Sequence, residues 1–369
     1  MTRVSLDATA IPDKPVGAGR YVVELAAALG RAGDVALTVL SRRGDGARWA
    51  TPGVAGVVEA APGGRPLRLA WEQVRLPRLL AELGVDVHHA PHYTMPRRAR
   101  LPRVVTVHDL TFFDHPEWHE RSKVAVFCRA IRAASVGAAA IVCVSRSTAD
   151  RLDALLAPAV PVHVVHHGVD HARFRPDDHG GDEALLARLG VRRPYVAFVG
   201  TLEPRKDVPT LVRAFDRLAP ARPDLALVLA GGRGWGARAV DAAVAAAAGS
   251  ARIVRPGYVP DDAVPALLRS AAAVAYPSLA EGFGLPALEA MACGAPLVTT
   301  ERTAMAEVAG DSALLVPPGD DAALAAALAT LIDGDADRDR RRRRGLQLAA
   351  GYTWEASAAA HAEVYRSVA

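Results

Sequence analysis

Short apolar segments that alternate with amphipathic helical patterns constrain the fold of this 369-residue chain more than any other feature. A predicted strand at 4–8, a glycine-containing loop and a helical pattern open the first half, and the strand predicted at 195–199 starts the same alternation again. Near-continuous apolar strands such as 104–108 are typical of parallel sheets that helices cover on both faces. The sequence therefore predicts two doubly wound α/β domains, and the length fits two domains of about 150 residues or more.

A segment rich in Gly, Pro and Asp lies between the two halves, at residues 168–182 (GVDHARFRPDDHGGD). This composition is typical of a linker. We therefore expect an N-terminal domain over residues 1–170 and a second domain over residues 171–352. A last amphipathic pattern at 354–368 predicts a final helix.

Two stretches of the first half are harder to assign from their pattern. Residues 44–64 are expected to be irregular, and residues 67–83 are expected to form one helix that carries Arg68, Arg75 and Arg78 among leucines. A basic amphipathic helix can lie on a membrane surface. It can also pack on a sheet and expose a solvated basic face, which is the more common arrangement and the one expected here.

The composition excludes several classes of protein. The hydrophobic share of 51% depends largely on alanine, and no apolar run reaches the roughly 18 residues of a spanning helix. The first fifteen residues lack the apolar core of a secretory signal, and the three cysteines have no metal-binding or disulfide-framework spacing. A net charge of +4 suits an anionic ligand or an anionic membrane surface, while nucleic-acid motifs are absent. A cytoplasmic chain is expected, with contact to the inner face of the membrane left open.

The stretch 278–294 (SLAEGFGLPALEAMACG) has the strongest functional pattern. A glycine loop at 282–284 precedes Pro286, a residue suited to the first turn of a helix, and Gly294 indicates where that helix stops. Free N–H groups and the positive end of the helix dipole would face the loop and could bind phosphate. Glu281 would lie at the mouth of the loop and Glu289 one turn into the helix, where carboxylates can accept hydrogen bonds from sugar hydroxyls.

Two adjacent cations follow another predicted strand end. Arg205 and Lys206 come shortly after Gly200 and Thr201 at the end of strand 195–199. A guanidinium and an ammonium in this position can neutralise a diphosphate. The alternative is an ordinary surface pair, which the residues alone leave open.

The first half offers a histidine and a glycine loop at strand ends. His108 ends the strand at 104–108, where ligands of parallel sheets bind, and it can exchange a hydrogen bond or a proton with a sugar hydroxyl. A lone histidine at a strand end more often has a structural role, and the residues alone favour that alternative. Gly17 and Gly19 lie in a loop that follows the first strand, but the sequence around them is no complete dinucleotide-binding fingerprint. The other histidines have no spacing typical of metal ligands, so no metal is expected.

The motif Glu-Gly-Phe-Gly-Leu-Pro at 281–286, with Glu289 three residues later, resembles the Glu-x7-Glu motif of retaining glycosyltransferases. The GT-B-fold glycosyltransferase family 4 (glycosyl transferases group 1) matches it best. The resemblance covers nearly the whole chain and is weakest at Gly17 and Gly19, where many relatives have adjacent glycines. It implies two Rossmann-like domains that face a cleft, an N-terminal acceptor domain, a C-terminal donor domain, and a last helix (353–369) that returns to the N-terminal domain.

The resemblance also implies the activity: retaining transfer of a hexose, with mannose as the first candidate, from a nucleotide diphosphate sugar to a glycan, lipid-linked or small-molecule acceptor. No cofactor or metal beyond this co-substrate is implied. The roles it implies are catalytic for His108, Arg205, Lys206 and Glu281. The remaining residues are implied to bind the donor: Gly17, Gly19, Gly200, Thr201, Gly282, Phe283, Gly284, Leu285 and Glu289.

Three other functions remain open at this point: a nucleotide-sugar epimerase of the same fold, a non-catalytic nucleotide-sugar-binding relative, and a Rossmann oxidoreductase. The incomplete dinucleotide fingerprint argues against the last. A second basic segment, residues 338–344, contains six arginines. It could bind nucleic acid or lipid, but a solvated helix face is the expected arrangement.

Overall fold

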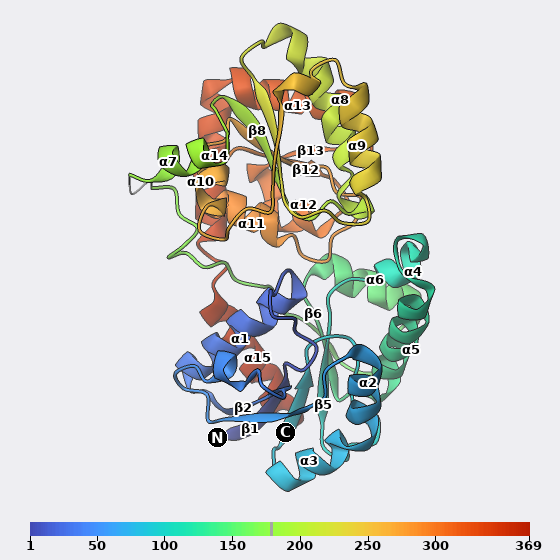
Figure 1. Cartoon of the computed structure of the whole chain (residues 1–369). Coiled ribbons are helices and arrows are strands. Elements are labelled where there is room, and N and C mark those ends of the chain that lie inside the picture. Colours follow the sequence, from blue (N-terminus) through green and yellow to red (C-terminus); the bar gives the residue numbers. More distant parts are fainter. Residues whose placement is uncertain (178–179) are drawn as a thin grey trace. The chain divides into compact units, whose positions relative to one another are not determined.

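The computed structural model describes residues 1–177 and 180–369. These residues form two compact units, each built around its own sheet (Figure 1). Unit 1 contains Met1–Gly168 together with Tyr352–Ala369, and unit 2 contains Val169–Gly351. The end of the chain therefore belongs to the same unit as its beginning.

The described part of unit 1 contains a seven-stranded, fully parallel sheet in the order β3-β2-β1-β4-β5-β6-β7. The order reverses between β1 and β4, so the carboxyl ends of these two strands form the switch point of a doubly wound sheet. The strands are β1 (Thr2–Asp7), β2 (Val35–Arg42), β3 (Gly56–Ala61), β4 (Val87–Ala90), β5 (Arg103–Val107), β6 (Ala140–Cys143) and β7 (Val162–Val164).

Helices cover this sheet on both faces (Figure 1). They are α1 (Ala18–Ala32), α2 (Arg65–Val74), α3 (Leu76–Leu83), α4 (Thr111–Asp114), α5 (Arg121–Gly137), α6 (Arg146–Leu156) and α15 (Trp354–Val368), with 3-10 turns η1 (Gly46–Trp49) and η2 (Pro116–Trp118). The N-terminus of α15 is capped by Thr353, whose Oγ1 accepts a hydrogen bond from the N–H of Ala356 at 3.0 Å. Helix α15 packs against α1, where Tyr21, Leu25 and Ala358 are fully buried.

Two predictions for unit 1 are wrong. The stretch expected to be irregular, 44–64, contains η1 and the edge strand β3, whose sequence GVVEAA has no clear alternation of apolar and polar residues. The single helix expected at 67–83 is divided at Arg75 into α2 and α3, because Pro77 has no N–H and restricts the residue before it. Arg68 is also not part of an exposed basic face, since it points inward and pairs with Glu72 at 3.3 Å.

The described part of unit 2 contains a six-stranded parallel sheet in the order β10-β9-β8-β11-β12-β13, with its switch point between β8 and β11. The strands are β8 (Tyr195–Val199), β9 (Ala226–Ala230), β10 (Ile253–Gly257), β11 (Ala273–Tyr276), β12 (Leu297–Thr300) and β13 (Leu314–Val316). All four residues of β11 are buried, as expected for a central strand covered on both faces.

The helices of unit 2 are α7 (Asp182–Arg188), α8 (Val208–Leu218), α9 (Ala237–Ala246), α10 (Val264–Arg269), α11 (Leu285–Ala292), α12 (Ala304–Ala309), α13 (Asp321–Asp333) and α14 (Asp335–Ala349). Short 3-10 turns connect them: η3 (Pro204–Lys206), η4 (Ala219–Ala221), η5 (Ser250–Arg252) and η6 (Gly310–Ser312). Helices α7 and α12 had no predicted counterpart, because each is only two turns or less and has no long apolar period. Among the described residues, no helix combines the length and apolarity needed to cross a bilayer.

Candidate active site

The loop between β11 and α11 turns sharply into the helix at Gly284. This residue has φ +97°, which L side chains rarely adopt, and a Cβ atom there would lie 2.5 Å from Cγ of Met305. Glycine is therefore required both by the backbone and by the packing of α12. The turn brings the first-turn N–H groups of α11 to the carboxyl edge of the sheet, with Pro286 in the first turn as expected.

Two hydroxyl groups of β12 hold the other end of this loop. Thr299 Oγ1 donates to the carbonyl of Tyr276 at 3.0 Å, and Thr300 Oγ1 donates to the carbonyl of Ser278. Both threonines are fully buried. The chain entering the loop is thus fixed to its neighbouring strand before it reaches Glu281.

The loop after β8 lies against the loop after β11. The carbonyl of Arg205 accepts a hydrogen bond from the N–H of Leu279 at 2.7 Å. The short turn η3 then presents Arg205 and Lys206 in succession. Arg205 and Leu279, which are 74 positions apart in the sequence, are thereby placed at one edge of unit 2.

Glu281 forms ion pairs with both cations. Its Oε2 lies 2.7 Å from Nη1 of Arg205, and its Oε1 accepts from Nζ of Lys206. The side chains of Glu281 and Lys206 are each only 7% exposed, while Arg205 remains 28% exposed. Ser278 Oγ donates to the same Oε1 at 3.3 Å, and Glu203 accepts from Nε of Arg205 at 2.7 Å. Sequence reasoning missed Glu203 and Ser278, although a carboxylate two residues before Arg205 was a usable signal.

The charged groups of this cluster shift one another's pKa values. Burial opposes ionisation of Glu281, but the charges of Arg205 and Lys206 outweigh it and lower the pKa of Glu281 to about 2. Burial lowers the pKa of Lys206, the charge of Arg205 lowers it further, and Glu281 partly offsets both. The carboxylate is therefore ionised at neutral pH, and it compensates a cation that burial alone would disfavour.

A glycine-rich loop supports the β8 side of this edge. Gly231 has φ +144°, and a Cβ atom there would lie 2.0 Å from the carbonyl oxygen of Gly200. The N–H of Leu202 donates to the carbonyl of Gly232 at 3.1 Å. Gly200 and Thr201 are half-buried in this close packing of two backbones, so their position depends on the GGRGWG loop, whose role the sequence did not predict.

Glu289 lies in the second turn of α11 and is half-buried. Its charge is the second cause, after burial, that raises the pKa of Tyr276, and the charge of Glu281 contributes to the same shift. Both glutamates of the motif therefore lie near the end of β11. Phe283 is buried in the loop between them, and Gly282 and Leu285 are half-buried.

In unit 1, His108 follows β5 and is only 7% exposed. Its Nε2 lies 2.7 Å from the carbonyl oxygen of Pro91. A carbonyl can only accept, so Nε2 carries the hydrogen and Nδ1 is the lone-pair acceptor in the neutral ring. Burial lowers the pKa of His108, which favours this neutral form.

The two glycines of the first loop have different structural roles. Gly17 precedes α1 with φ +50° and ψ −116°, a conformation suited to glycine. Gly19 is buried, and a Cβ atom there would lie 3.0 Å from Cβ of Pro15. Both therefore shape the start of α1, and neither carries a side chain that could do chemistry.

Comparison with known proteins gives the family. The model described as Glycosyltransferase Family 4 matches residues 15–173, and the model described as Glycosyl transferases group 1 matches residues 187–347. The O-antigen chain mannosyltransferase B of Escherichia coli is 31% identical over 296 residues, which are 79% of this chain and 74% of the relative. This chain belongs to glycosyltransferase family 4.

Other relatives and solved structures agree with this assignment. D-inositol 3-phosphate glycosyltransferase 1 of Catenulispora acidiphila is 34% identical over 84% of this chain and 81% of its own length. Sucrose-phosphate synthase from Thermosynechococcus elongatus has a TM-score of 0.81 at 21% identity, covering 100% of this chain and 99% of its own. Anabaena HepE in complex with UDP-glucose has a TM-score of 0.76 at 18% identity, covering 100% of both chains. The glycosyltransferase thus has the predicted GT-B fold.

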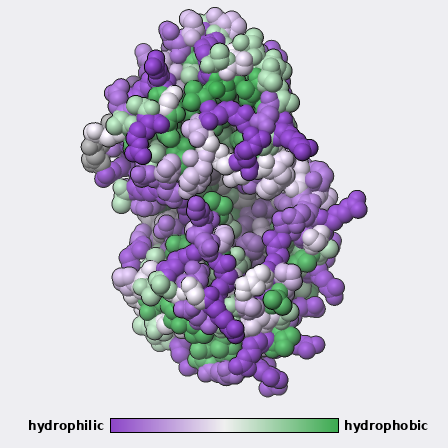
Figure 2. Space-filling model, viewed as in Figure 1, coloured by the Kyte–Doolittle hydropathy of each residue, from purple (hydrophilic) through white to green (hydrophobic). Residues whose placement is uncertain are grey.

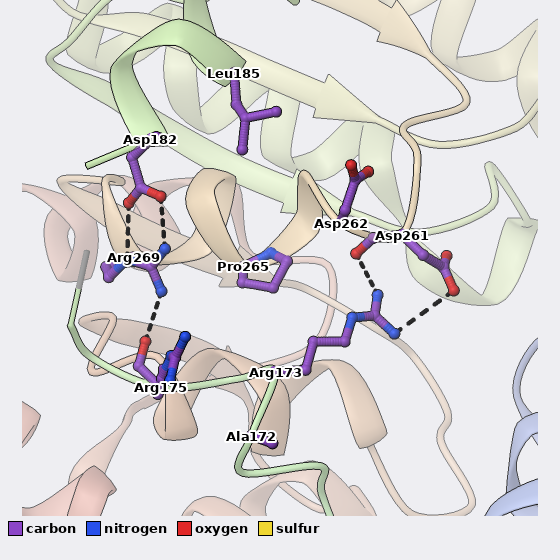
Figure 3. Close-up of a pocket in the computed structure, with 10 residues that line it drawn as sticks. Ala172, Arg173, Arg175, Asp182, Leu185, Asp261, Asp262, Pro265 and Arg269 are labelled. Atoms are coloured by element: carbon purple, nitrogen blue, oxygen red, sulfur yellow. Dashed lines mark hydrogen bonds and ion pairs between the residues drawn. The ribbon is translucent and has the colours of Figure 1, made fainter. Parts of the chain in front are cut away.

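A surface cavity of about 540 Å³ lies elsewhere in unit 2 of this glycosyltransferase, among residues 172–175, α7 and α10 (Figure 3). Four of its charged side chains form two pairs: Arg269 donates to both oxygens of Asp182 at 2.6 and 2.7 Å, and Arg173 lies 3.5 Å from Oδ2 of Asp261. None of its lining residues belongs to the Glu281 cluster. The cavity is therefore separate from the predicted site residues.

The described residues contain no cluster of three or more His, Cys, Asp or Glu side chains placed to bind a metal ion. The positive groups that the glycosyltransferase presents at the edge of unit 2 are Arg205, Lys206 and the first turn of α11. Preorganised donors of this kind can stabilise negative charge that develops during a reaction.

Proposed function

We propose that this glycosyltransferase transfers a hexosyl group, with mannose as the first candidate, from a nucleotide diphosphate sugar to an acceptor hydroxyl, with retention of configuration. The observation that carries this proposal is the pairing of Glu281 with Arg205 and Lys206 beside the start of α11. The mannosyl donor is supported by the 31% identity to an O-antigen mannosyltransferase.

In this proposal the diphosphate of the donor binds Arg205, Lys206 and the N–H groups of Gly284 and Leu285. The leaving diphosphate gains negative charge as the glycosidic bond breaks, and a guanidinium, an ammonium and a helix dipole all stabilise that charge. Glu281 keeps the two cations close together despite their mutual repulsion. The cations therefore do not have to be gathered at the moment of reaction.

Glu281 would also contact the donor sugar. Each carboxylate oxygen accepts more than one hydrogen bond, so a sugar hydroxyl can donate to Glu281 while both ion pairs persist. Backbone groups of Gly282 and Phe283 would meet other hydroxyls, and Glu289 would accept from the nucleotide ribose. Gly200 and Thr201 would contribute backbone contacts to the donor.

For unit 1, we propose that His108 acts through Nδ1, which can accept a hydrogen bond from a sugar hydroxyl because Nε2 is committed to Pro91. The loop with Gly17 and Gly19 would approach the ligand through its backbone. A front-face reaction is proposed for the transfer, in which the acceptor attacks on the side that the diphosphate leaves. The acceptor is proposed to be a glycan, a lipid-linked glycan or a small polyol.

A thermal-shift screen tests the donor. A ligand at about 100 times its dissociation constant stabilises the folded state by about 2.7 kcal/mol. We expect GDP-mannose to raise the unfolding temperature more than UDP-glucose, and Arg205→Ala to abolish both effects. If no nucleotide diphosphate sugar raised the unfolding temperature, the proposal would be wrong.

Product analysis tests the reaction itself. Incubation with the stabilising donor and a panel of glycan and polyol acceptors should give a glycosylated product and free nucleoside diphosphate. A change in the sugar of an intact nucleotide sugar would instead identify an epimerase. Binding with no turnover of any acceptor and no donor hydrolysis would identify a non-catalytic relative.

A further inference from the structure

Helices α2 and α5 of unit 1 lie near each other (Figure 1), and hydrogen bonds connect both of them to the loop 95–100. At one end, Arg65 of α2 acts electrostatically on Glu120, which precedes α5. At the other end, Gln73 of α2 donates to the carbonyl of Met95 at 2.9 Å and accepts from the N–H of Arg97 at 3.2 Å. Both ends of α2 therefore lie near these neighbours, and we call the surface of α2, residues 95–100 and α5 the basic face.

The far end of α5 is joined to the same loop. Arg103 donates to the carbonyl of Gly137 at 2.7 Å and to the carbonyl of Arg97 at 3.0 Å. A Cβ atom at Gly137 would lie 3.6 Å from Met95. Helices α2 and α5 and the loop 95–100 thus form one contiguous part of unit 1 rather than three separate segments.

Exposed arginines of the basic face have no acidic partner. Within the described residues, no ion pair is made by the side chains of Arg97, Arg98, Arg100, Arg121 and Arg129. The nearby acid Glu120 is already paired with Lys123 at 2.8 Å. This surface therefore carries uncompensated positive charge.

The other arginine-rich segment is different. On α14, five of the six arginines in 338–344 pair with aspartates: Arg338 with Asp335, Arg340 and Arg341 with Asp337, Arg342 with Asp339, and Arg344 with Asp311. These ion pairs stabilise α14 and connect it to η6. The segment is therefore consistent with the solvated helix face expected from the sequence. The sequence alone could not distinguish the two basic segments, because ion pairing depends on which acids the fold brings near.

Large apolar side chains are exposed among the arginines of the basic face. Leu67 and Val74, at one side of α2, are 65% and 73% exposed, and Val126 and Val136 of α5 are 38% and 72% exposed. On α5, positions 121, 125, 129, 132 and 136 lie on one helical side, so arginine and valine share it. Figure 2 likewise shows apolar and hydrophilic residues interspersed over the surface.

We propose that the basic face binds the surface of an anionic lipid bilayer. Unpaired arginines are attracted to anionic headgroups, and the exposed leucine and valines can enter the boundary between headgroups and acyl chains. A nucleic acid would use the same charges but would gain nothing from apolar side chains at this spacing. The combination of the two features therefore favours a lipid surface. The proposal does not depend on the sugar donor or on the chemistry of unit 2.

Vesicle co-sedimentation of the full chain tests this proposal. At about 0.1 M salt, where charges are screened beyond roughly 10 Å, we expect binding to vesicles that mix phosphatidylglycerol with phosphatidylcholine, and little binding to phosphatidylcholine alone. Each arginine near such a surface contributes about fivefold in affinity, so Arg97→Gln with Arg129→Gln should weaken binding by about 25-fold. The control is Arg343→Gln on α14, which removes one positive charge from unit 2 and should leave binding unchanged, whereas Arg97→Gln or Arg129→Gln alone should weaken it about fivefold.

Apolar variants separate lipid from other polyanions. Val74→Ser with Val136→Ser should weaken vesicle binding by about tenfold or more, because both side chains lose apolar contact. Both positions are exposed, so the unfolding temperature should stay that of the unaltered protein. Equal binding to phosphatidylcholine alone, or arginine variants that bind like the unaltered protein, would overturn the proposal. Binding to single-stranded DNA without vesicle binding would assign the basic face to nucleic acid instead.

Discussion

Glu281 is the residue on which the cation cluster of unit 2 depends. Arg205 and Lys206 are adjacent in the sequence and repel each other, and each takes a different oxygen of the same buried carboxylate. Pro286 and the neighbouring glycines allowed a helix start near 286 to be predicted, because they report local backbone conformation, and α11 begins at Leu285. The ion pairs could not be predicted with the same ease, since they depend on how two loops 75 residues apart meet.

Replacement of a cation tests this cluster. We expect Lys206→Ala and Arg205→Ala each to lower kcat by on the order of 10²-fold or more, because in the proposed mechanism each removes a preorganised charge beside the leaving diphosphate. Steady-state kinetics with the identified donor measures the effect. Arg213→Ala is a suitable control, since Arg213 pairs with Asp321 on the surface of α8 and α13. Turnover like that of the unaltered enzyme in both cation variants would remove them from the mechanism.

Gly231 offers a test of how the site is supported. A Cβ atom at Gly231 would meet the backbone of Gly200, which cannot move aside like a flexible side chain, whereas Gly232 has open space. We expect Gly231→Ala to destabilise the protein by about 2 kcal/mol or more, from the strained φ and the backbone clash. Gly232→Ala should change stability by less than about 1 kcal/mol. Equal unfolding temperatures for the two variants would show that the two loops do not pack as described.

At the scale of elements, α15 is held to unit 1 by a buried chain of hydrogen bonds with a fixed direction. The carbonyl of Ser357 can only accept, so Nδ1 of His361 carries the hydrogen, at 2.7 Å. In the neutral ring Nε2 then accepts from the hydroxyl of Tyr21, at 2.9 Å. Tyr21 has used its single hydrogen, so it accepts from Thr106 at 3.0 Å.

The remaining members of the chain follow from the same rule. Thr106 has donated its hydrogen, so it accepts from Nε2–H of His89 at 2.7 Å. Nδ1 of His89 then accepts from the hydroxyl of Tyr365, also at 2.7 Å. One backbone carbonyl of α15 therefore determines the tautomers of two histidines that lie in different elements.

This order can be tested directly. Nitrogen NMR shifts at neutral pH should show hydrogen on Nδ1 of His361 and on Nε2 of His89. Tyr21→Phe leaves His361 and Thr106 without their shared partner and should cost about 1–3 kcal/mol of unfolding free energy. Tyr365→Phe should cost no more, because only His89 loses a partner. The opposite tautomer at either histidine would contradict the direction of the chain.

The buried histidines also predict how stability depends on pH. Burial lowers the pKa of His361 and of His88 to about 4, and it lowers the pKa of His89, His92, His108 and His167 as well. Between about pH 6.5 and 4 the unfolded chain binds protons that the folded chain does not, so stability should fall as the pH falls through this window.

Two carboxyl groups with pKa values raised by burial, Glu72 and Asp207, oppose this trend. Burial raises the pKa of Glu72 to about 7, so the folded chain binds an extra proton over part of the same window, which offsets about one histidine. Urea unfolding at several pH values measures the net slope, about 1.4 kcal/mol per pH unit for each uncompensated histidine. His361→Gln removes one titrating group and should flatten the slope. If the slope were the same in His361→Gln as in the unaltered protein, this histidine would bind protons equally well in the folded and the unfolded chain.

The sequence predicted elements well where their signal is local. The alternation of strands and helices, the start of α11 and the final helix all follow from apolar period, proline and glycine. The edge strand β3 and the short α12 were missed, because the strand sequence GVVEAA and a six-residue helix carry weak periodicity. The hydrogen-bond chain could not be predicted from the sequence either, since Tyr21 and His361 lie 340 positions apart. Neither residue belongs to a local motif that would indicate its partner.

At the scale of the whole molecule, the chain leaves unit 1 and re-enters it at the same place. A Cβ atom at Gly168 would lie 2.2 Å from the N atom of Trp354 and 2.4 Å from the carbonyl carbon of Thr353. Residues 1–168 without α15 would expose the buried side of α1 and would lose Ser357, His361 and Tyr365, three members of the hydrogen-bond chain. Unit 1 is therefore one folding unit made from two separated stretches of sequence.

This arrangement predicts that unit 1 folds without unit 2 when its two stretches are joined. A chain in which residues 1–168 are connected to residues 352–369 through a short glycine–serine linker should unfold cooperatively, because the exit and re-entry points are adjacent and a short loop closes at low entropic cost. Residues 1–168 alone should show a weaker transition or none, which circular dichroism during heating can measure. The joined chain with Tyr21→Phe should be less stable than the joined chain itself. That result would show that the cooperative transition depends on native packing of α15 against α1. If residues 1–168 alone unfolded as cooperatively and at the same temperature as the joined chain, α15 would not be part of this folding unit.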